Sequence, residues 1–289
     1  MVSELVKAGK IPPVLETDID IKKVIVHNGR FHADDVGVIA LLRECYNPDI
    51  EYERVDYCTL NSVFVDILEK EPNTIIADVG GSFDGERRFD HHQMNSGESH
   101  CALSLLWGVY GNPYYSFLGS FIKEIAEHDS KRDLFKRTQT LNCIGYMNAY
   151  DANSEENMRN LEKAIDIMRT LIRGCINEQI IFAQGVNKIE ESYKYANDSK
   201  TIAMIPSDLI YYADRWASLH PEVRAVAYHK ANKFFVTMYQ WYNTRSDIPS
   251  NGIVTIDPYR YNKTRIYRYN TPNLSTVKLL VEKAKRINN

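Results

Sequence analysis

Two short apolar runs in the first third of the chain each stop at a residue type that binds metal. Residues 22–26 (KKVIV) end at His27, and residues 74–77 (TIIA) end at Asp78. Runs of this length and composition predict short buried strands. In open α/β sheets, ligands bind in the crevice beyond the carboxyl ends of the strands. We therefore expect an α/β fold in which His27 and Asp78 lie at one edge of a parallel sheet.

The first run leads into a turn and then a helix. The dipeptide NG at 28–29 predicts the turn, and Asp34 and Asp35 precede an apolar helical run over residues 36–42. Carboxylates are favoured at this end of a helix. We expect His32 and Asp34 to lie beside the first strand end, in one strand–loop–helix corner.

Histidine and aspartate are concentrated in four segments. These are residues 27–35 (HNGRFHADD), 78–81 (DVGG), 90–92 (DHH) and 128–129 (HD), which hold five of the eight histidines. A single histidine at a strand end is more often hydrogen-bonded than a metal ligand. The concentration here favours a metal site. Imidazole and carboxylate together suit Mn²⁺, Fe²⁺ or Zn²⁺, whereas an all-oxygen set would suit Mg²⁺ or Ca²⁺.

The order of these segments resembles that of the DHH phosphoesterase superfamily. The triplet at 90–92 follows DVGG at 78–81, and the pattern His27-x-Gly-x-Phe-His32-x-Asp34 lies upstream. Most DHH proteins carry Asp where this chain has His32, and the histidine is a mark of the MYG1 family, also labelled UPF0160 or metal-dependent protein hydrolase. The resemblance covers the first 130 residues. It implies a parallel-sheet N-terminal lobe of DHH type, a smaller α+β C-terminal lobe, and an active site in the cleft between them.

The resemblance also implies how the ligands divide between two divalent metal ions. The ligands of one ion would be His27, His32 and Asp78. The ligands of the other ion would be Asp34, Asp78, His91 and Asp129. Asp78 would then bridge the pair.

Catalytic roles follow from the same resemblance. His92 would face the substrate phosphate, and Asp90 would orient the histidines from behind, as carboxylates around metal ligands commonly do. Asp78 would act through the metal bridge. Asp129 matches the family only as an Asp that follows a helix, and the neighbouring His128 is an alternative ligand.

The activity that the resemblance implies is phosphodiester hydrolysis, most specifically exonuclease action on RNA or short oligonucleotides. Two ions about 3.5–4 Å apart can bind a phosphoryl group and share a bridging hydroxide, so no serine or cysteine nucleophile is needed. We expect Mn²⁺, with Mg²⁺, Fe²⁺ or Zn²⁺ as alternatives. One alternative function is a phosphatase or phosphodiesterase acting on a small signalling nucleotide. Another is a protein that sequesters a nucleotide or nucleic acid without turning it over.

The chain departs from the family near its C-terminus, where relatives usually carry a glycine-rich phosphate-binding stretch. Residues 256–269 (IDPYRYNKTRIYRY) interleave tyrosine with arginine instead. Guanidinium groups and stacking faces could replace backbone amides there, although the same alternation is typical of an exposed strand.

The candidate substrate-binding residues are Arg88, His100, Arg260, Arg265 and Arg268.

Charge is distributed unevenly along the chain. The net charge is −3, but residues 228–289 hold eleven lysines or arginines against three acids, which gives +8 there and −11 elsewhere. A basic C-terminal region would attract a phosphate-rich substrate. A solvated basic surface explains the same pattern equally well.

Four regions are expected along the chain. They are an N-terminal extension (1–19), the metal-binding lobe (20–153), a linking helical segment (154–197) and a basic substrate lobe (198–289). The linking segment carries an apolar stripe at helical spacing, at Leu161, Ile165, Met168, Ile172 and Ile176. The last region is expected to contain a helix over 208–219, a hairpin of strands 224–228 and 234–241, and a final helix over 275–287.

The five cysteines suggest the compartment. They are scattered and form no C-x-x-C pair, which suits reduced thiols better than a disulfide framework. The first residues have no apolar signal-peptide core, and no later run approaches the length of a membrane span. We expect a cytoplasmic protein whose partner is an RNA, oligonucleotide or small nucleotide substrate. We expect no association with a membrane.

Overall fold

The computed structural model describes residues 11–94, 99–130, 139–238, 253–256, 267–271, 275 and 278. The chain divides into two compact units, Met1–Gln179 and Ile180–Asn289. The division falls inside helix α7 (Glu155–Ser192), within the segment expected to link two lobes. The predicted position of the active site, in a cleft between the lobes, stays a prediction.

The first unit is built on a parallel sheet of four strands in the order β2-β1-β3-β4. The strands are β1 (Lys23–His27), β2 (Glu51–Val55), β3 (Thr74–Ala77) and β4 (Arg88–Phe89). Strands β1 and β3 are apolar and buried, as expected for strands covered on both faces. Edge strand β2 is half exposed and more polar. The predicted α/β fold with a parallel sheet is confirmed.

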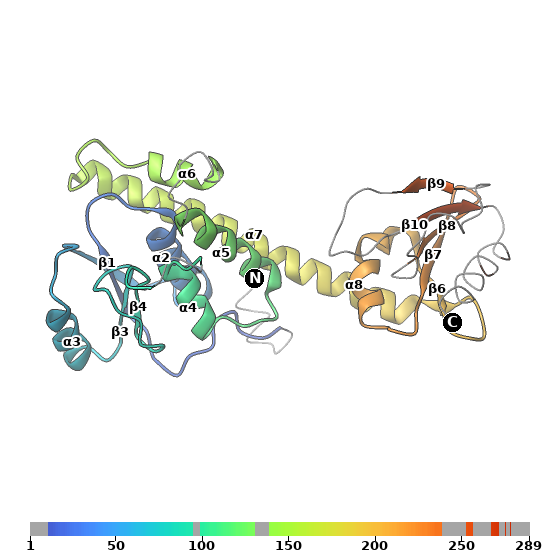
Figure 1. Ribbon diagram of the computed structural model, residues 1–289, viewed down its shortest axis with the longest axis horizontal. Coiled ribbons are helices and arrows are strands. Elements are labelled where there is room, and N and C mark those ends of the chain that lie inside the picture. Colours follow the sequence, from blue (N-terminus) through green and yellow to red (C-terminus); the bar gives the residue numbers. More distant parts are fainter. Residues whose placement is uncertain are drawn as a thin grey trace. The chain divides into compact units, whose positions relative to one another are not determined.

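Helices cover both faces of this sheet (Figure 1). On one face, Phe64 and Leu68 of α3 (Asn61–Lys70) pack against Ile25 and Ile76. The other face is covered by α2 (Ala33–Cys45) and α4 (Ala102–Tyr110), and α5 (Ser116–Ser130) packs against these two helices. Helix α2 is buried from Ala33 to Leu42, as a helix in the middle of a unit should be.

Asp34 and Asp35 lie in the first turn of α2, ahead of the apolar run at 36–42, as expected for carboxylates at this end of a helix. His32 is the N-cap residue. The backbone N–H of His32 donates a hydrogen bond of 2.7 Å to Oδ1 of Asp35. This contact satisfies an N–H group at the helix start.

Helix α7 follows α6 (Gln139–Tyr146) and packs on the first unit through its N-terminal half. The five residues of its predicted apolar stripe are all buried. Arg169 and Arg173 add ion pairs of 3.2 and 2.6 Å to Glu44 near the end of α2. The predicted helical stripe is thus confirmed.

The second unit contains a mixed sheet in the order β5-β6-β7-β8-β10-β9. Its strands are β5 (Lys194–Tyr195), β6 (Ile202–Met204), β7 (Ala225–Lys230), β8 (Lys233–Met238), β9 (Ile253–Ile256) and β10 (Tyr267–Thr271). The predicted hairpin is formed by β7 and β8, whose two turn residues, Ala231 and Asn232, have positive φ angles. A two-residue turn of this kind matches the twist of antiparallel strands.

Helices complete the second unit. The predicted helix over 208–219 is a 3₁₀ turn, η2 (Ser207–Tyr212), that continues as α8 (Ala213–Ser218). Trp216 of α8 is fully buried in the core of this unit and donates a hydrogen bond to Glu190. Of the final helix predicted over 275–287, Ser275 and Lys278 are helical and the rest lies outside the described residues.

Within the described part of the chain, no helix has the length and apolar character needed to cross a membrane.

Candidate metal centre

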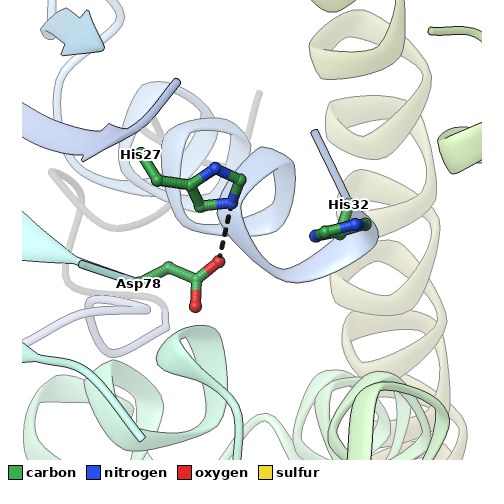
Figure 2. Close-up of side chains that lie close together, drawn as sticks. All are labelled: His27, His32 and Asp78. Carbon is green, nitrogen blue, oxygen red and sulfur yellow. Dashed lines mark ion pairs between the residues drawn. The ribbon is translucent and has the colours of Figure 1, made fainter. Parts of the chain in front are cut away.

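Two strand ends form the base of the candidate site. His27 is the last residue of β1, and Asp78 directly follows β3. These strands are parallel neighbours, so both side chains emerge at the same edge of the sheet. Figure 2 shows the imidazole and the carboxylate pointing toward each other, with 3.1 Å between Nε2 of His27 and Oδ2 of Asp78. Both residues are almost fully buried, at 4% and 2% exposed.

The backbone at Asp78 is held in an uncommon conformation. Its φ angle is 58°, in the left-handed region, which costs a non-glycine residue about 1–2 kcal/mol. Gly80 follows at φ 92°, where an added Cβ would meet the Phe64 ring at 2.8 Å. Strained backbone of this kind is concentrated at functional sites. Here it directs one carboxylate at two histidines, because Oδ1 of Asp78 lies 3.4 Å from Nε2 of His91.

The first candidate ligand group consists of His27, His32 and Asp78, whose ligand atoms all lie within 4.8 Å of one another. His32 comes from the loop before α2 and lies on the far side of His27 from the strand (Figure 2). Nδ1 of His27 donates to the carbonyl oxygen of Asn28 at 2.7 Å. With its proton on Nδ1, His27 presents Nε2 to the group. This is the tautomer in which Nε2 can bind a metal ion.

The second candidate ligand group consists of Asp34, His91 and Asp129. Nε2 of His91 lies 3.4 Å from Oδ2 of Asp129 and 3.9 Å from Oδ2 of Asp34. The first group has the same members as one predicted ligand set. The second group holds three of the four members of the other predicted set, and the fourth, Asp78, lies 3.4 Å from His91. Among the described residues, His128 belongs to neither of these groups, nor to the other clusters that could hold a metal ion. The division of ligands between two ions stays a prediction.

The buried carboxylates provide a test of whether a cation fits. Both side-chain oxygens of Asp34 and Oδ2 of Asp35 are buried without a hydrogen-bond partner. Burial, and then the neighbouring carboxylates, raise the pKa of Asp34 well above its ordinary value. Burial also raises the pKa of Asp35, to about 6, against the opposing effect of His27. Unsatisfied acidic oxygens packed together are what a divalent cation would neutralise, so the donor set fits a metal.

His27 and Asp78 form the charged pair at the centre of the site. Burial acts to lower the pKa of His27, but the hydrogen bond with Asp78 and the charge of Asp35 outweigh it and raise the pKa to about 9. Burial acts to raise the pKa of Asp78, and the hydrogen bonds with His27 and His91 outweigh it, so the pKa falls below its ordinary value. Asp78 is therefore anionic at neutral pH, as a bridging ligand must be.

Asp90 and His92 form a pair beside the metal ligands. Oδ1 of Asp90 lies 2.6 Å from Nδ1 of His92 and accepts the His92 backbone N–H at 3.0 Å. Oδ2 of Asp90 accepts the Gly81 N–H at 2.6 Å. The ring of His92 is thus fixed while 42% of its side chain remains exposed. The hydrogen bond with Asp90 raises the pKa of His92. This geometry suits the orienting and substrate-facing roles predicted for the two residues, which remain untested.

The candidate substrate-binding residues lie in several places. Arg88 of β4 donates to the Asn61 side chain and, at 3.3 Å, to the Gly80 carbonyl oxygen. Its neighbour Arg87, which precedes β4, also reaches α3 and donates to the Leu68 carbonyl oxygen at 2.9 Å. His100 lies just before α4. The side chain of Arg268, in β10, and all of Arg260 and Arg265 lie outside the described residues.

Three side chains that the sequence does not single out hold the loop between His27 and His32. Arg54 of β2 donates to the carbonyl oxygens of Gly29, at 2.8 Å, and His27, at 3.2 Å. Asn148 accepts the Phe31 N–H at 2.9 Å and donates to the Phe31 carbonyl oxygen at 2.8 Å. Asn157, fully buried in α7, accepts the Ala149 N–H at 2.8 Å and so fixes the segment that carries Asn148.

Tyr57 is a further residue at the site that the sequence does not single out. It lies in the loop after β2, and its ring centroid is 5.7 Å from that of His27 and 5.3 Å from that of His92. Burial, and then the charges of four nearby aspartates, raise its pKa to about 12. Tyr57 reaches the site because it follows β2, which pairs in parallel with β1 and ends at the same edge of the sheet.

Residues 23–233 match the family model MYG1_exonuc, described as "Uncharacterised protein family (UPF0160)". The chain belongs to this family. The predicted family is therefore confirmed over most of the chain. No curated protein matches.

Two solved structures resemble this chain. A pGpG-specific phosphodiesterase, PggH from Vibrio cholerae, shares 12% identity at a TM-score of 0.30, covering 93% of this chain and 99% of that one. RecJ from Thermus thermophilus, in complex with Mg²⁺, shares 13% identity at a TM-score of 0.28, covering 92% of this chain and 49% of that one. TM-scores this low carry no inference about the activity of this chain.

Proposed function

We propose that this protein is a two-metal-dependent phosphodiesterase that cleaves RNA or short oligonucleotides as an exonuclease. The observation that supports this most directly is the carboxylate of Asp78, which presents one oxygen to His27 at 3.1 Å and the other to His91 at 3.4 Å. A carboxylate shared in this way could supply a ligand to each of two ions, which two-metal hydrolysis needs close together. The family model that the chain matches also carries the exonuclease label in its name.

The chain offers a ligand set for each ion. His27, His32 and Asp78 would hold one, and Asp34, Asp78, His91 and Asp129 would hold the other. The mixture of imidazole and carboxylate supports Mn²⁺ as the working ion. When bound, such a pair supplies a nucleophile at neutral pH and neutralises charge on the phosphoryl group.

His92 is the residue proposed to act on the substrate. Its exposed imidazole, fixed by Asp90, would donate a hydrogen bond to a phosphate oxygen or a proton to the leaving oxygen. The hydrogen bond with Asp90 raises the pKa of His92 and so favours the protonated form that such a donor needs. A cysteine nucleophile is not required. Cys101 is buried, and its burial raises the pKa of the thiol well above its ordinary value.

The deciding experiment uses one panel of substrates with Mn²⁺. It contains 5′-labelled RNA, 5′-labelled DNA, linear dinucleotides and cyclic dinucleotides. We expect stepwise shortening of RNA or short oligonucleotides, lost in Asp78→Ala. Turnover of the dinucleotides alone would point to a signalling-nucleotide phosphodiesterase. Tight binding of a panel member without products from any of them would refute hydrolysis and favour a sequestering protein.

A further inference from the structure

We propose that Tyr57 forms a binding site for the nucleobase that flanks the scissile phosphate. This inference rests on the proposed function, because it assigns the organic part of the same substrate. The ring lies within 5.3 Å of the His92 ring and 5.7 Å of the His27 ring, measured between centroids. One of these imidazoles is a proposed metal ligand and the other is the proposed phosphate contact. A group bound against Tyr57 is therefore adjacent to the phosphate.

The loop that carries Tyr57 has a defined conformation. It follows β2 as a turn in which Thr59 N–H donates to the Asp56 carbonyl oxygen at 2.9 Å. The Asp56 side chain also accepts the Cys58 N–H at 2.8 Å. A turn closed by its own aspartate presents the intervening side chain in a fixed direction. The ring is also oriented by edge contacts, at interplanar angles of 87° to His92 and 68° to His27.

The exposure of Tyr57 argues for a ligand rather than for packing alone. Tyr57 is 50% exposed, although two neighbours in the same cluster, His27 and Asp78, are almost completely buried. An aromatic ring that only shielded these groups would bury most of its own surface. Half of the surface of Tyr57 instead stays exposed beside His92, the proposed phosphate contact. In a nucleotide, the groups next to a phosphate are the sugar and the base, and every base has a π-face that stacks on tyrosine regardless of sequence.

The test compares three substrates. One is an intact 5′-labelled oligoribonucleotide, and each of the other two has the same phosphates but an abasic site at one of the two nucleotides that flank the cleaved bond. We expect Tyr57→Ala to raise KM about tenfold for the intact substrate and to leave KM for one of the abasic substrates nearly unchanged. Tyr57→Phe should behave as the wild type, because the ring and not the hydroxyl makes the contact. Tyr146→Ala, at an exposed tyrosine that ends α6, is the matched control.

The outcomes separate this inference from the proposed function. An equal effect of Tyr57→Ala on intact and abasic substrates, or a loss of Mn²⁺ from that variant, would overturn the base-binding role and leave the phosphodiesterase intact. If the wild type cleaves none of the substrates, the comparison is made by calorimetry with adenosine 5′-monophosphate and ribose 5-phosphate in Mn²⁺. About tenfold tighter binding of the nucleotide, abolished in Tyr57→Ala, supports the base site. Equal binding of both compounds overturns it.

Discussion

Asp34→Asn should stabilise the protein when metal has been removed, although it damages the proposed metal site. The carboxylate oxygens of Asp34, Asp35 and Asp78 lie within 4.8 Å of one another. At that distance and an effective dielectric constant of about 20, two unit charges repel by about 3.5 kcal/mol. Proton uptake and the nearby imidazoles offset part of this repulsion. Relieving one charge with a nearly isosteric amide should therefore raise the free energy of unfolding by about 1–2 kcal/mol.

The sign of the effect also fixes its pH dependence. The folded-state pKa of Asp34 is raised above its ordinary value of 3.8, so the folded protein holds this proton more tightly than the unfolded chain. The cost of ionising Asp34 is therefore absent below pH 3.8 and grows as the pH rises toward the folded-state pKa. The stabilisation by Asp34→Asn should be present at neutral pH and vanish in acid.

The assay is thermal unfolding of wild type and variant, with EDTA and with Mn²⁺. A change of 1 kcal/mol shifts Tm by about 2–4 °C in a domain of 150–250 residues, and the first unit spans residues 1–179. We expect a higher Tm for Asp34→Asn in EDTA and a smaller rise on adding Mn²⁺. Asp66→Asn, at an exposed carboxylate of α3, should change neither. A variant less stable than wild type in EDTA would refute the repulsion on which the reasoning depends.

Three further predictions concern single residues. The hydrogen bond with Asp78 raises the pKa of His27 to about 9. The protonated imidazole therefore stabilises the metal-free protein, and this contribution is fully present below pH 6.5 and lost as the pH rises through 9. Mn²⁺ affinity should therefore increase over the same range, and calorimetric titrations showing constant affinity would contradict this. Asn148→Ala removes two hydrogen bonds to Phe31 and should lower the free energy of unfolding in urea by about 2–3 kcal/mol. Asn148→Asp should lower it less, and an unchanged urea midpoint in Asn148→Ala would contradict the contact. His92→Ala should lower kcat about 100-fold while metal content by elemental analysis stays nearly constant, and unchanged turnover would remove its assigned role.

The strands, the long helix and the hairpin were predictable because each is specified by a local pattern. KVIV before His27 and TIIA before Asp78 are apolar on both faces, which fits strands covered by helices on both sides. The stripe from Leu161 to Ile176 repeats at helical spacing and is buried in α7. Parallel pairing of β1 with β3 then brings the two strand ends together.

The support of the metal-binding loop could not be predicted in the same way. Asn148 contacts Phe31 across 117 residues of sequence, and nothing near either residue indicates the other. Asn157 looks in the sequence like any polar residue of a helix, yet it is completely buried and bonded to backbone. Contacts of this kind depend on where the helices pack, which a single sequence does not specify.

Metal stoichiometry tests the central claim most directly. Protein stripped with EDTA and then titrated with Mn²⁺ in a calorimeter should bind two equivalents per chain. Asp78→Ala should bind neither ion with comparable affinity, because both candidate groups meet at this carboxylate, whereas Asp66→Asn should bind both. Full two-ion occupancy in Asp78→Ala, or a single equivalent in the wild type, would contradict a metal pair bridged by Asp78.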